Sequence, residues 1–255
     1  MPARIDVNAD LGESFGPWTM GDDEAMLSVV TSANVACGGH AGDHETMFRS
    51  CELAVDNGVV VGAQPGYLDP AGFGRRIIPM APAEITRMVA VQVGALMGAA
   101  ALAGSVVRYV KAHGALGNLA ARDRGVAAAV AEAVAAFDPG LAVLAISGTA
   151  MEDVAREAGL DTYSEIFADR GYRSDGQLVP RDQPGALLHD PGEALDRLLG
   201  FVETGAMPTV DGGSIPLRAH SVCVHGDSPG AVDMARVVRA GLAESGIAIR
   251  SFLEP

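Results

Sequence analysis

The sequence predicts an α/β fold in which parallel strands close, or nearly close, into a single barrel. Short predicted strands alternate with predicted helices along all 255 residues, with no break in composition that would divide the chain. The strands are continuous β-branched and apolar runs, which is typical of a parallel sheet covered on both faces. Seven or eight such units favour a barrel, and an open doubly wound sheet is the alternative. We therefore expect one domain over residues 1–255.

Each predicted strand is a short run of small or branched apolar residues that ends in a polar or glycine-containing segment. The predicted strands cover residues 5–9, 32–37, 59–63, 106–110, 141–146, 162–167 and 221–224. Residues 247–249 are predicted as a short closing strand.

Helices are predicted after these strands, and several carry start or stop signals. Three acidic residues precede the first helix, where negative charge complements the helix dipole. Glycine follows the second and third helices as a left-handed cap. The predicted helices cover residues 25–30, 44–57, 83–103, 115–136, 149–158, 192–204 and 231–245.

The composition excludes several classes of partner. The chain has a formal net charge of −14 and no basic patch, so we expect neither nucleic acid nor an anionic membrane surface as a partner. The amino terminus is charged and polar within its first residues, unlike a signal peptide. The most apolar window, residues 88–104, is marginal for a membrane span and favours a buried helix or a contact within a homo-oligomer. A cytoplasmic location follows.

The cysteines do not indicate a disulfide framework or a zinc ribbon. Cys37, Cys51 and Cys223 are odd in number, widely spaced and without a C-x-x-C pair. Cys37 and Cys223 lie in predicted strand ends, where we expect them to act as small hydrophobic residues of the core.

Lys111 is the chain's one lysine, against seventeen arginines. It follows the predicted strand at 106–110 directly, and His113 comes two residues later, before a helix. An ammonium can lose its proton when it is partly desolvated, whereas a guanidinium effectively cannot. We therefore predict a functional role for Lys111 rather than a solvated surface charge.

Polar residues follow most of the predicted strands. In a barrel of parallel strands, the loops after the strands share one face, so these side chains are expected to meet in a pocket. Asp43 has a second interpretation, because helix N-caps take Asp for structural reasons. The residues are Asn8, Asp10, Glu13, His40, Asp43, Gln64, Lys111, His113, Asp169, Arg170, His225 and Asp227.

Two chemistries fit such a pocket, and the spacing leaves both open. In the first, carboxylates and imidazoles hold a divalent metal that activates water. No H-E-x-x-H spacing is present, so such a site would be assembled from distant strands. In the second, Lys111 and Arg170 bind or polarise an anionic substrate while Asp and His groups move protons. The metal-ligand candidates are Asp10, Glu13, His40, His113, His225 and Asp227.

Long motifs along nearly the whole chain resemble the LamB/YcsF family. They include N-A-D-L-G-E-S at residues 8–14, S-A-N-V-A-C-G-G-H-A-G-D at 32–43, G-F-G-R-R at 72–76, K-A-H-G-A-L at 111–116, F-A-D-R at 167–170 and V-H-G-D at 224–227. The resemblance implies a (β/α)7 barrel-like fold related to sugar deacetylases. It also implies ATP-dependent opening of the 5-oxoproline (pyroglutamate) lactam to L-glutamate, together with 5-oxoprolinase subunits B and C.

The resemblance and the predicted pocket together assign roles to the strand-end residues. The catalytic candidates are Asp10, Glu13, His40, Lys111, His113 and Asp227. The substrate-binding candidates are Asn8, Asp43, Gln64, Arg170 and His225. We expect the substrate carboxylate to pair with Arg170 or Lys111, and protons to be handled by Asp10, His113 and Asp227. No Walker A motif is present, so ATP would be used through the complex with the partner subunits, and a divalent metal stays an open possibility.

Three positions depart from the family pattern. Gln64 stands where His is usual, Gly39 where an aromatic residue is usual, and Gly117 where Tyr is usual. Glutamine keeps hydrogen-bonding groups but cannot titrate and is a poor metal ligand. The two glycines remove bulk, which we expect to widen the choice of substrate.

Two other functions compete with lactam opening. One is a metal-dependent carbohydrate deacetylase, which would need a bound ion. The other is a non-catalytic subunit that binds a ligand or acts as a scaffold. The presence of metal and the effect of pocket mutations would distinguish these alternatives.

Overall fold

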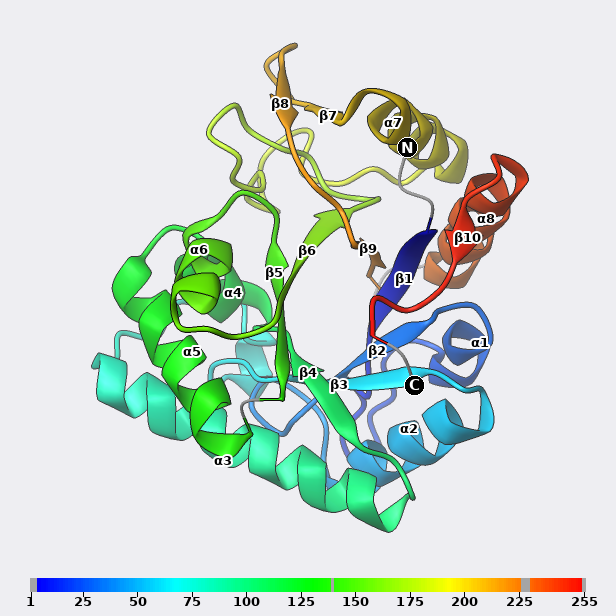
Figure 1. Cartoon of the computed structure of the whole chain (residues 1–255). Coiled ribbons are helices and arrows are strands. Elements are labelled where there is room, and N and C mark those ends of the chain that lie inside the picture. The colour runs from blue at the N-terminus through cyan, green and yellow to red at the C-terminus, as the bar shows by residue number, and fades with distance from the viewer. Residues whose placement is uncertain (1–3, 139, 226–229, 254–255) are drawn as a thin grey trace.

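A barrel of parallel strands forms the centre of the protein, as seen in a computed structural model that describes residues 4–138, 140–225 and 230–253. Within this part of the chain, seven strands pair in chain order, and β9 pairs with both β6 and β1, which closes the barrel (Figure 1). The closed barrel confirms the predicted fold class, and the open sheet is wrong. The barrel strands are β1 Arg4–Leu11, β2 Ser32–Ala36, β3 Val60–Gln64, β4 Val107–Val110, β5 Ala142–Ile146, β6 Thr162–Phe167 and β9 Ser221–Val224.

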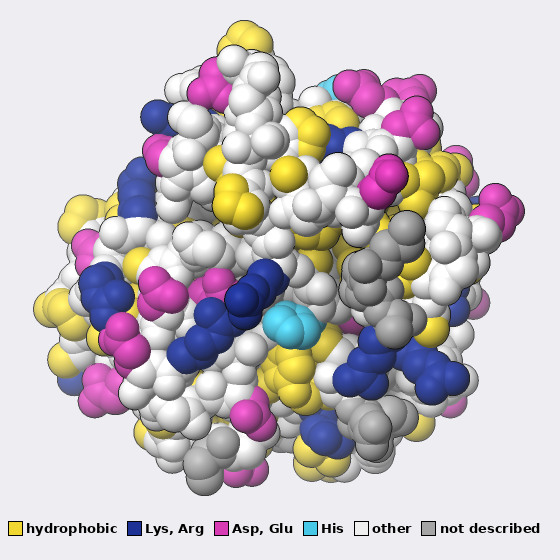
Figure 2. All heavy atoms as spheres, turned by 45° about the horizontal axis from the view of Figure 1, so that its top comes forward, with side chains coloured by type: hydrophobic (Ala, Val, Ile, Leu, Met, Phe, Trp, Pro, Cys, Tyr) yellow, Lys and Arg dark blue, Asp and Glu magenta, His cyan; other side chains and the backbone are white. Residues whose placement is uncertain are grey.

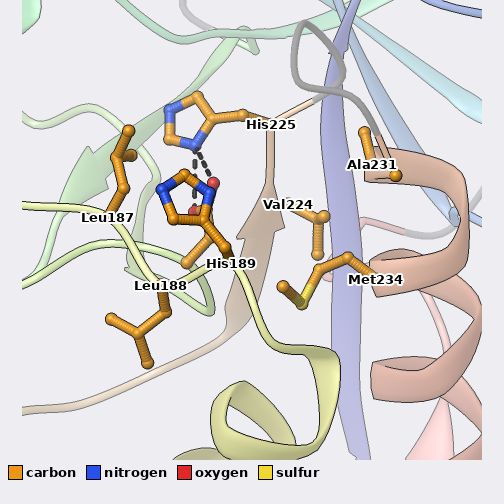
Figure 3. A pocket seen from close by; sticks show the side chains of 9 residues that line it. Leu187, Leu188, His189, Val224, His225, Ala231 and Met234 are labelled. Carbon is orange, nitrogen blue, oxygen red and sulfur yellow. Dashed lines mark hydrogen bonds and ion pairs between the residues drawn. The ribbon is translucent and has the colours of Figure 1, made fainter.

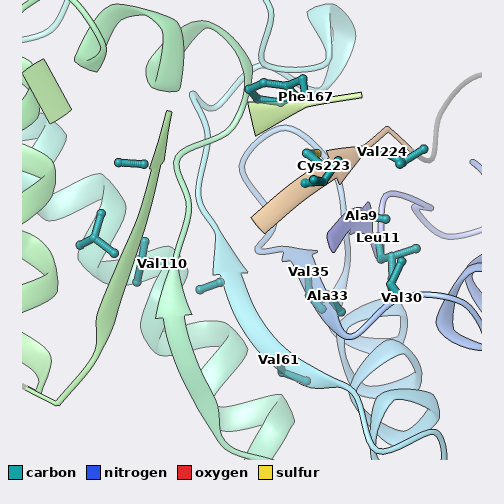
Figure 4. Close-up of a cluster of buried hydrophobic side chains, with 14 of the residues drawn as sticks. Ala9, Leu11, Val30, Ala33, Val35, Val61, Val110, Phe167, Cys223 and Val224 are labelled. Carbon is teal, nitrogen blue, oxygen red and sulfur yellow. The ribbon is translucent and has the colours of Figure 1, made fainter. Parts of the chain in front are cut away.

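Helices surround the barrel and pack on its outer face (Figure 1). The apolar layer between strands and helices includes Ala9, Leu11, Val35 and Val61 from three neighbouring strands (Figure 4). The helices are α1 Asp23–Leu27, α2 His44–Asp56, α3 Pro82–Leu102, α4 Gly114–Ala120, α5 Arg124–Phe137, α6 Ala150–Glu157, α7 Pro191–Thr204 and α8 Ala231–Glu244, with a 3₁₀ turn η1 at Pro70–Gly72.

Two elements differ from the sequence-based prediction. The single helix expected at residues 115–136 is two helices, α4 and α5, because the Asp123 carboxylate accepts hydrogen bonds from the main-chain N–H groups of Gly125 and Val126 and caps α5. A small antiparallel hairpin, β7 Ala206–Pro208 and β8 Ser214–Pro216, was not predicted, because its strands are only three residues long.

The predicted closing strand exists but does not close the barrel. β10, Ala248–Ile249, pairs in parallel with the start of β1. Phe252 follows it and packs with Val60, Tyr109, Ala142 and Leu144. Because Val60 and Ala142 begin their strands, this apolar cluster fills the barrel at the end opposite to the predicted pocket.

Helix α3 has the length and composition that would allow a helix to cross a membrane, and it is the one such helix among the described residues. Its buried side includes Val89, Val93 and Leu96 and packs against α5 and α2. Val91 and Leu102 lie exposed on its other side. The helix is therefore buried on one side only, and a contact of its exposed side within a homo-oligomer stays a prediction. On the molecular face in Figure 2, acidic and basic side chains are interspersed.

Strand β1 alternates polar and apolar residues, which the sequence-based interpretation of continuous apolar runs missed. In β1, Asp6, Asn8 and Asp10 alternate with Val7, Ala9 and Leu11, and all are buried. Successive side chains of a strand point to opposite faces. The apolar set packs under the helices, so the polar set points into the barrel, where it builds the site described next.

Candidate active site

A cavity of about 660 Å³ opens at the carboxyl ends of the strands. Its walls come from β1, β3, β5, β6 and α4, from the segment 111–113 after β4, and from the loop at residues 170–182. The predicted site residues that line it are Asp10, Gln64, Lys111, His113, Arg170 and His225. The predicted convergence of strand-end groups is therefore seen for these six residues.

Lys111 lies at the centre of a buried ion-pair network. Its Nζ is 3.0 Å from Asp10 Oδ1 and 2.8 Å from Glu165 Oε1. It also donates to Cys223 Sγ at 3.2 Å and to Asn8 Oδ1 at 3.3 Å. Burial alone would lower the pKa of Lys111, but the neighbouring Asp10 and Glu165 carboxylates hold it well above its ordinary value. Lys111 is therefore a fixed ammonium and not the proton-losing lysine that the sequence suggested.

The same network fixes Asp10 in its ionised form. Burial opposes the charge of Asp10, but the Lys111 ammonium outweighs it and lowers the pKa of Asp10 far below the usual range. Asn34 Nδ2 donates to Asp10 Oδ1 at 2.9 Å and to Asn8 Oδ1 at 2.6 Å. Tyr109 donates its hydroxyl to Asn34 Oδ1 at 2.7 Å. Asn8 is thus part of the support below Asp10, and it does not line the cavity.

Glu165 and Asn34 are network members that sequence reasoning missed, and Cys223 contacts Lys111 rather than only packing in the core. All three lie within strands, whereas the predicted site residues lie at or after the ends of the predicted strands. The available signal was a carboxylate or amide inside an otherwise apolar strand. In a closed barrel such a side chain points into the barrel interior.

His225 is held by Asp169 at the edge of the cavity. The ring Nδ1 is 2.8 and 3.0 Å from the two Asp169 carboxylate oxygens (Figure 3). Because a carboxylate accepts, Nδ1 carries the proton in the neutral ring, and Nε2 is left as the basic nitrogen. Burial opposes the charge of Asp169, but His225 outweighs it and lowers the pKa of Asp169. The predicted residue Asp227 lies outside the described residues.

Glu13, His40 and His113 form a second cluster beside the cavity. Their ligand atoms lie within 4.8 Å of one another, so this group could hold a metal ion. His40 Nε2 is 3.4 Å from Glu13 Oε1, and His113 Nδ1 is 3.8 Å from it. Burial lowers the pKa of His40 well below its ordinary value and that of His113 to about 4, so both rings are neutral at ordinary pH. Only His113 of the three lines the cavity.

Arg170 forms part of a basic wall of the cavity. Its Nη2 donates to the Val179 carbonyl at 2.6 Å and its Nε to the Ala186 carbonyl at 3.1 Å, which fixes the guanidinium plane. Burial and the neighbouring Arg181 lower the pKa of Arg170 to about 10, which still leaves it charged. The other arginines that line the cavity are Arg75, Arg122, Arg173 and Arg181.

Gln64 is fully buried and lines the cavity. Among the described residues, neither its side-chain oxygen nor its side-chain nitrogen has a hydrogen-bond partner. A buried amide without partners costs free energy, so this carboxamide is a binding group that a ligand can satisfy.

Asp43 has a structural role and does not line the cavity. It is the N-cap of α2, where its carboxylate accepts from the Thr46 N–H at 2.8 Å and from the Gly16 N–H. The structure shows Asp43 as a helix cap, which was the second interpretation of this residue. Its role in substrate binding stays a prediction.

The two unusual glycines differ in their surroundings. Gly117 lines the cavity, and a Cβ at this position would come within 2.4 Å of the Ala112 carbonyl oxygen; the expected effect on substrate choice stays a prediction. Gly39 does not line the cavity. A side chain at this position would collide with Gln92, whose amide forms hydrogen bonds with both the N–H and the carbonyl of Gly66. Gln92 therefore takes the space that a larger residue at position 39 would need.

Comparison with known proteins identifies the relatives of this chain. It is 54% identical over 250 residues to the A subunit of 5-oxoprolinase from Mycobacterium avium (strain 104), covering 98% of this chain and 99% of that protein. It is 51% identical over 247 residues to the protein of the same name from Gluconobacter oxydans (strain 621H), covering 97% of each.

Solved structures agree with this relationship. The crystal structure of a lactam utilization protein from Thermus thermophilus superposes with a TM-score of 0.92 at 43% identity, covering 98% of this chain and 100% of that one. A putative cellobiose-phosphate cleavage protein from Enterococcus faecalis V583, at 13% identity and a TM-score of 0.58, shares the fold alone. The model of the LamB/YcsF family matches residues 5–255, and this chain belongs to that family.

Proposed function

We propose that this chain is the A subunit of an ATP-dependent 5-oxoprolinase, a cytoplasmic enzyme that opens the lactam of 5-oxo-L-proline to L-glutamate with partner subunits B and C. The names of its relatives and of the Thermus structure support a role in lactam use. The cavity supplies hydrogen-bonding, cationic and basic groups in one space. The lactam is a stable amide, and coupling to ATP through the complex supplies the activation that its opening needs.

The observation that carries this proposal is the unsatisfied carboxamide of Gln64 in the cavity wall. A five-membered lactam holds its amide in the cis form, so its N–H and C=O lie along one edge. A side-chain carboxamide presents a matching acceptor and donor and can form two parallel hydrogen bonds with that edge. An acyclic acetamide prefers the trans form by about 2.5 kcal/mol and turns its two groups apart. Gln64 therefore favours a lactam over the acetamide of a carbohydrate deacetylase.

The other groups take complementary roles in this proposal. Arg170 and the arginines beside it attract the substrate carboxylate, since the Lys111 ammonium already faces Asp10 and Glu165. Lys111 stabilises negative charge that develops on the lactam oxygen. His225, oriented by Asp169, takes a proton from the attacking water and returns it to the lactam nitrogen as the C–N bond breaks. Asp10 stays ionised and fixes Lys111.

The proposal is tested by glutamate release from 5-oxoproline with ATP and the B and C subunits present. Gln64→Ala is expected to weaken 5-oxoproline binding by about tenfold or more, since two hydrogen bonds to a buried group are lost. Gln183→Ala, at an exposed position, is the matched control and should bind as the wild type. No glutamate from the complete complex, or activity indifferent to every cavity variant, would overturn the proposal. Acetate release from an acetylated sugar would support the deacetylase instead.

A further inference from the structure

We propose that Glu13, His40 and His113 form a binding site for a divalent transition metal of the Zn²⁺ type, beside the cavity and separate from the Lys111 network. These residues follow β1, β2 and β4, which places them at the same end of the barrel. All three are buried, and their ligand atoms lie within 4.8 Å of one another. The inference concerns binding alone and does not depend on the proposed reaction.

The hydrogen bonding of His113 shows which nitrogen is available. Its Nε2 lies 3.0 Å from the Phe73 carbonyl oxygen, which can only accept, so Nε2 carries the proton of the neutral ring. Its Nδ1 therefore holds a lone pair. This nitrogen is buried and has no hydrogen-bond partner among the described residues, while the Glu13 carboxylate lies 3.8 Å away. An acceptor nitrogen next to a carboxylate is the arrangement that a cation stabilises.

His40 supplies the third ligand of the proposed metal site. Its Nε2 lies 3.4 Å from Glu13 Oε1, and its Nδ1 is another buried atom without a partner among the described residues. Zinc binds imidazole nitrogens at about 2.0–2.1 Å, which places neighbouring ligand atoms about 3.3 Å apart. The two rings now stack at 3.5 Å with an interplanar angle of 1°, so their lone pairs lie in parallel planes. Binding requires the rings to tilt toward each other and the ligand atoms, now up to 4.8 Å apart, to close by up to about 1.5 Å.

The surroundings of the rings resemble the support that metal ligands need. A ligating histidine usually donates its other N–H to a carbonyl or carboxylate, as His113 does to Phe73. Phe73 is the one non-glycine residue with positive φ, +54°, in the described part of the chain. Such backbone strain tends to persist at functional sites. The Phe73 ring also packs edge-on against both imidazoles, at 5.4 and 5.3 Å between centroids.

Two glycines allow the backbone to approach the imidazoles closely. A side chain at Gly66 would come within 2.9 Å of His40 Nδ1, and one at Gly74 within 2.7 Å of His40 Cβ. The imidazoles are therefore enclosed by main chain and by Phe73. Two histidines and a glutamate leave further coordination positions open, as in catalytic zinc sites. His113 also lines the cavity, so the site is placed to supply an activated water or a Lewis acid there.

The test is metal binding by the purified full chain, without substrate or partner subunits. After chelation and dialysis, titration with Zn²⁺ is expected to give one ion per chain, and Co²⁺ is expected to give the visible absorption of a nitrogen-ligated ion. His40→Asn and His113→Asn should each weaken Zn²⁺ binding at least a hundredfold. His44→Asn is the matched control, because His44 is exposed on α2 and should leave binding unchanged.

Circular dichroism of each variant checks that the barrel remains folded. Glu13→Gln is a second variant of similar size, and it should weaken binding while its fold is retained. Wild-type protein that binds no Zn²⁺ at millimolar concentration would overturn the inference. So would binding that survives in the folded His40→Asn/His113→Asn double variant. Neither result bears on glutamate release, so this inference and the proposed function fail separately.

Discussion

The two polar clusters at the mouth of the barrel differ in whether they contain a fixed cation. In the Lys111 network, the ammonium forms ion pairs with two carboxylates and donates hydrogen bonds to two further acceptors. In the cluster of Glu13, His40 and His113, an imidazole nitrogen of each histidine has no hydrogen-bond partner among the described residues. A cluster with its own cation holds its carboxylates in place, whereas a cluster of a carboxylate and neutral imidazoles is stabilised by a bound cation. The first therefore organises the cavity, and the second is suited to binding.

The largest effect is expected from removing Lys111. Lys111→Met leaves Asp10 and Glu165 buried together without their cation, so we expect a loss of about 3–5 kcal/mol in the free energy of unfolding. Glutamate release should fall by about 100-fold or more. Urea unfolding and the coupled glutamate assay measure the two effects.

A matched double variant separates charge balance from function. Lys111→Met/Glu165→Gln removes one charge of each sign but leaves Asp10 buried without its cation, so it should recover only the stability lost through repulsion between Asp10 and Glu165. It should not recover activity, because the ammonium is still absent. A single Lys111→Met variant with wild-type stability would contradict the view that this network is held by charge.

The next effect concerns Asp6, deeper in the barrel. Its carboxylate accepts from the hydroxyls of Thr31, Ser32 and Ser221, yet burial raises its pKa to about 6. A pKa raised on folding stabilises the protein at low pH, and this contribution is lost as pH rises through about 6. Asp6→Asn should therefore gain about 3 kcal/mol over the wild type at pH 8 and well under 1 kcal/mol at pH 4. Unfolding titrations across this range measure the difference, and a gain that does not change with pH would contradict it.

A slightly smaller effect tests whether the two clusters are independent. At a Zn²⁺ concentration one hundred times its dissociation constant, the free energy of unfolding should rise by about 2.7 kcal/mol. The same rise is expected in Lys111→Met/Glu165→Gln, and at most about 0.4 kcal/mol in His113→Asn, whose binding is weakened at least a hundredfold. Thermal unfolding with and without the ion measures it. Loss of the zinc effect in the Lys111 double variant would mean that the clusters act as one unit.

The smallest effect is expected at Asp43, which lies outside both clusters. Asp43→Ala removes the N-cap of α2 and should cost about 1 kcal/mol of stability. Asp43→Ser keeps a capping oxygen and should restore most of it. Binding of 5-oxoproline should be unchanged in both, measured by calorimetry. Weaker binding of 5-oxoproline in the stable Asp43→Ser variant would show that Asp43 contributes to substrate binding.

The sequence by itself determined the order of the seven barrel strands and the end of the barrel at which the cavity opens. Strand periodicity and helix signals are local properties, so they could be recognised without the fold. The positions of Asp10, Lys111 and His113 directly after strands were enough to predict that they meet, because parallel strands present their carboxyl ends together. Lys111 stood out because no other lysine is present.

Only the tertiary structure decided which of these groups pair and which line the cavity. Glu165 reaches Lys111 from inside β6 across 54 residues of sequence, and that contact depends on the register set when β9 closes the barrel. Asp43 and Gln64 look alike as polar residues after strands, but one caps a helix and the other remains unsatisfied in the wall. Local sequence fixes the periodicity of each strand, whereas burial and partners depend on long-range packing, which no short motif encodes.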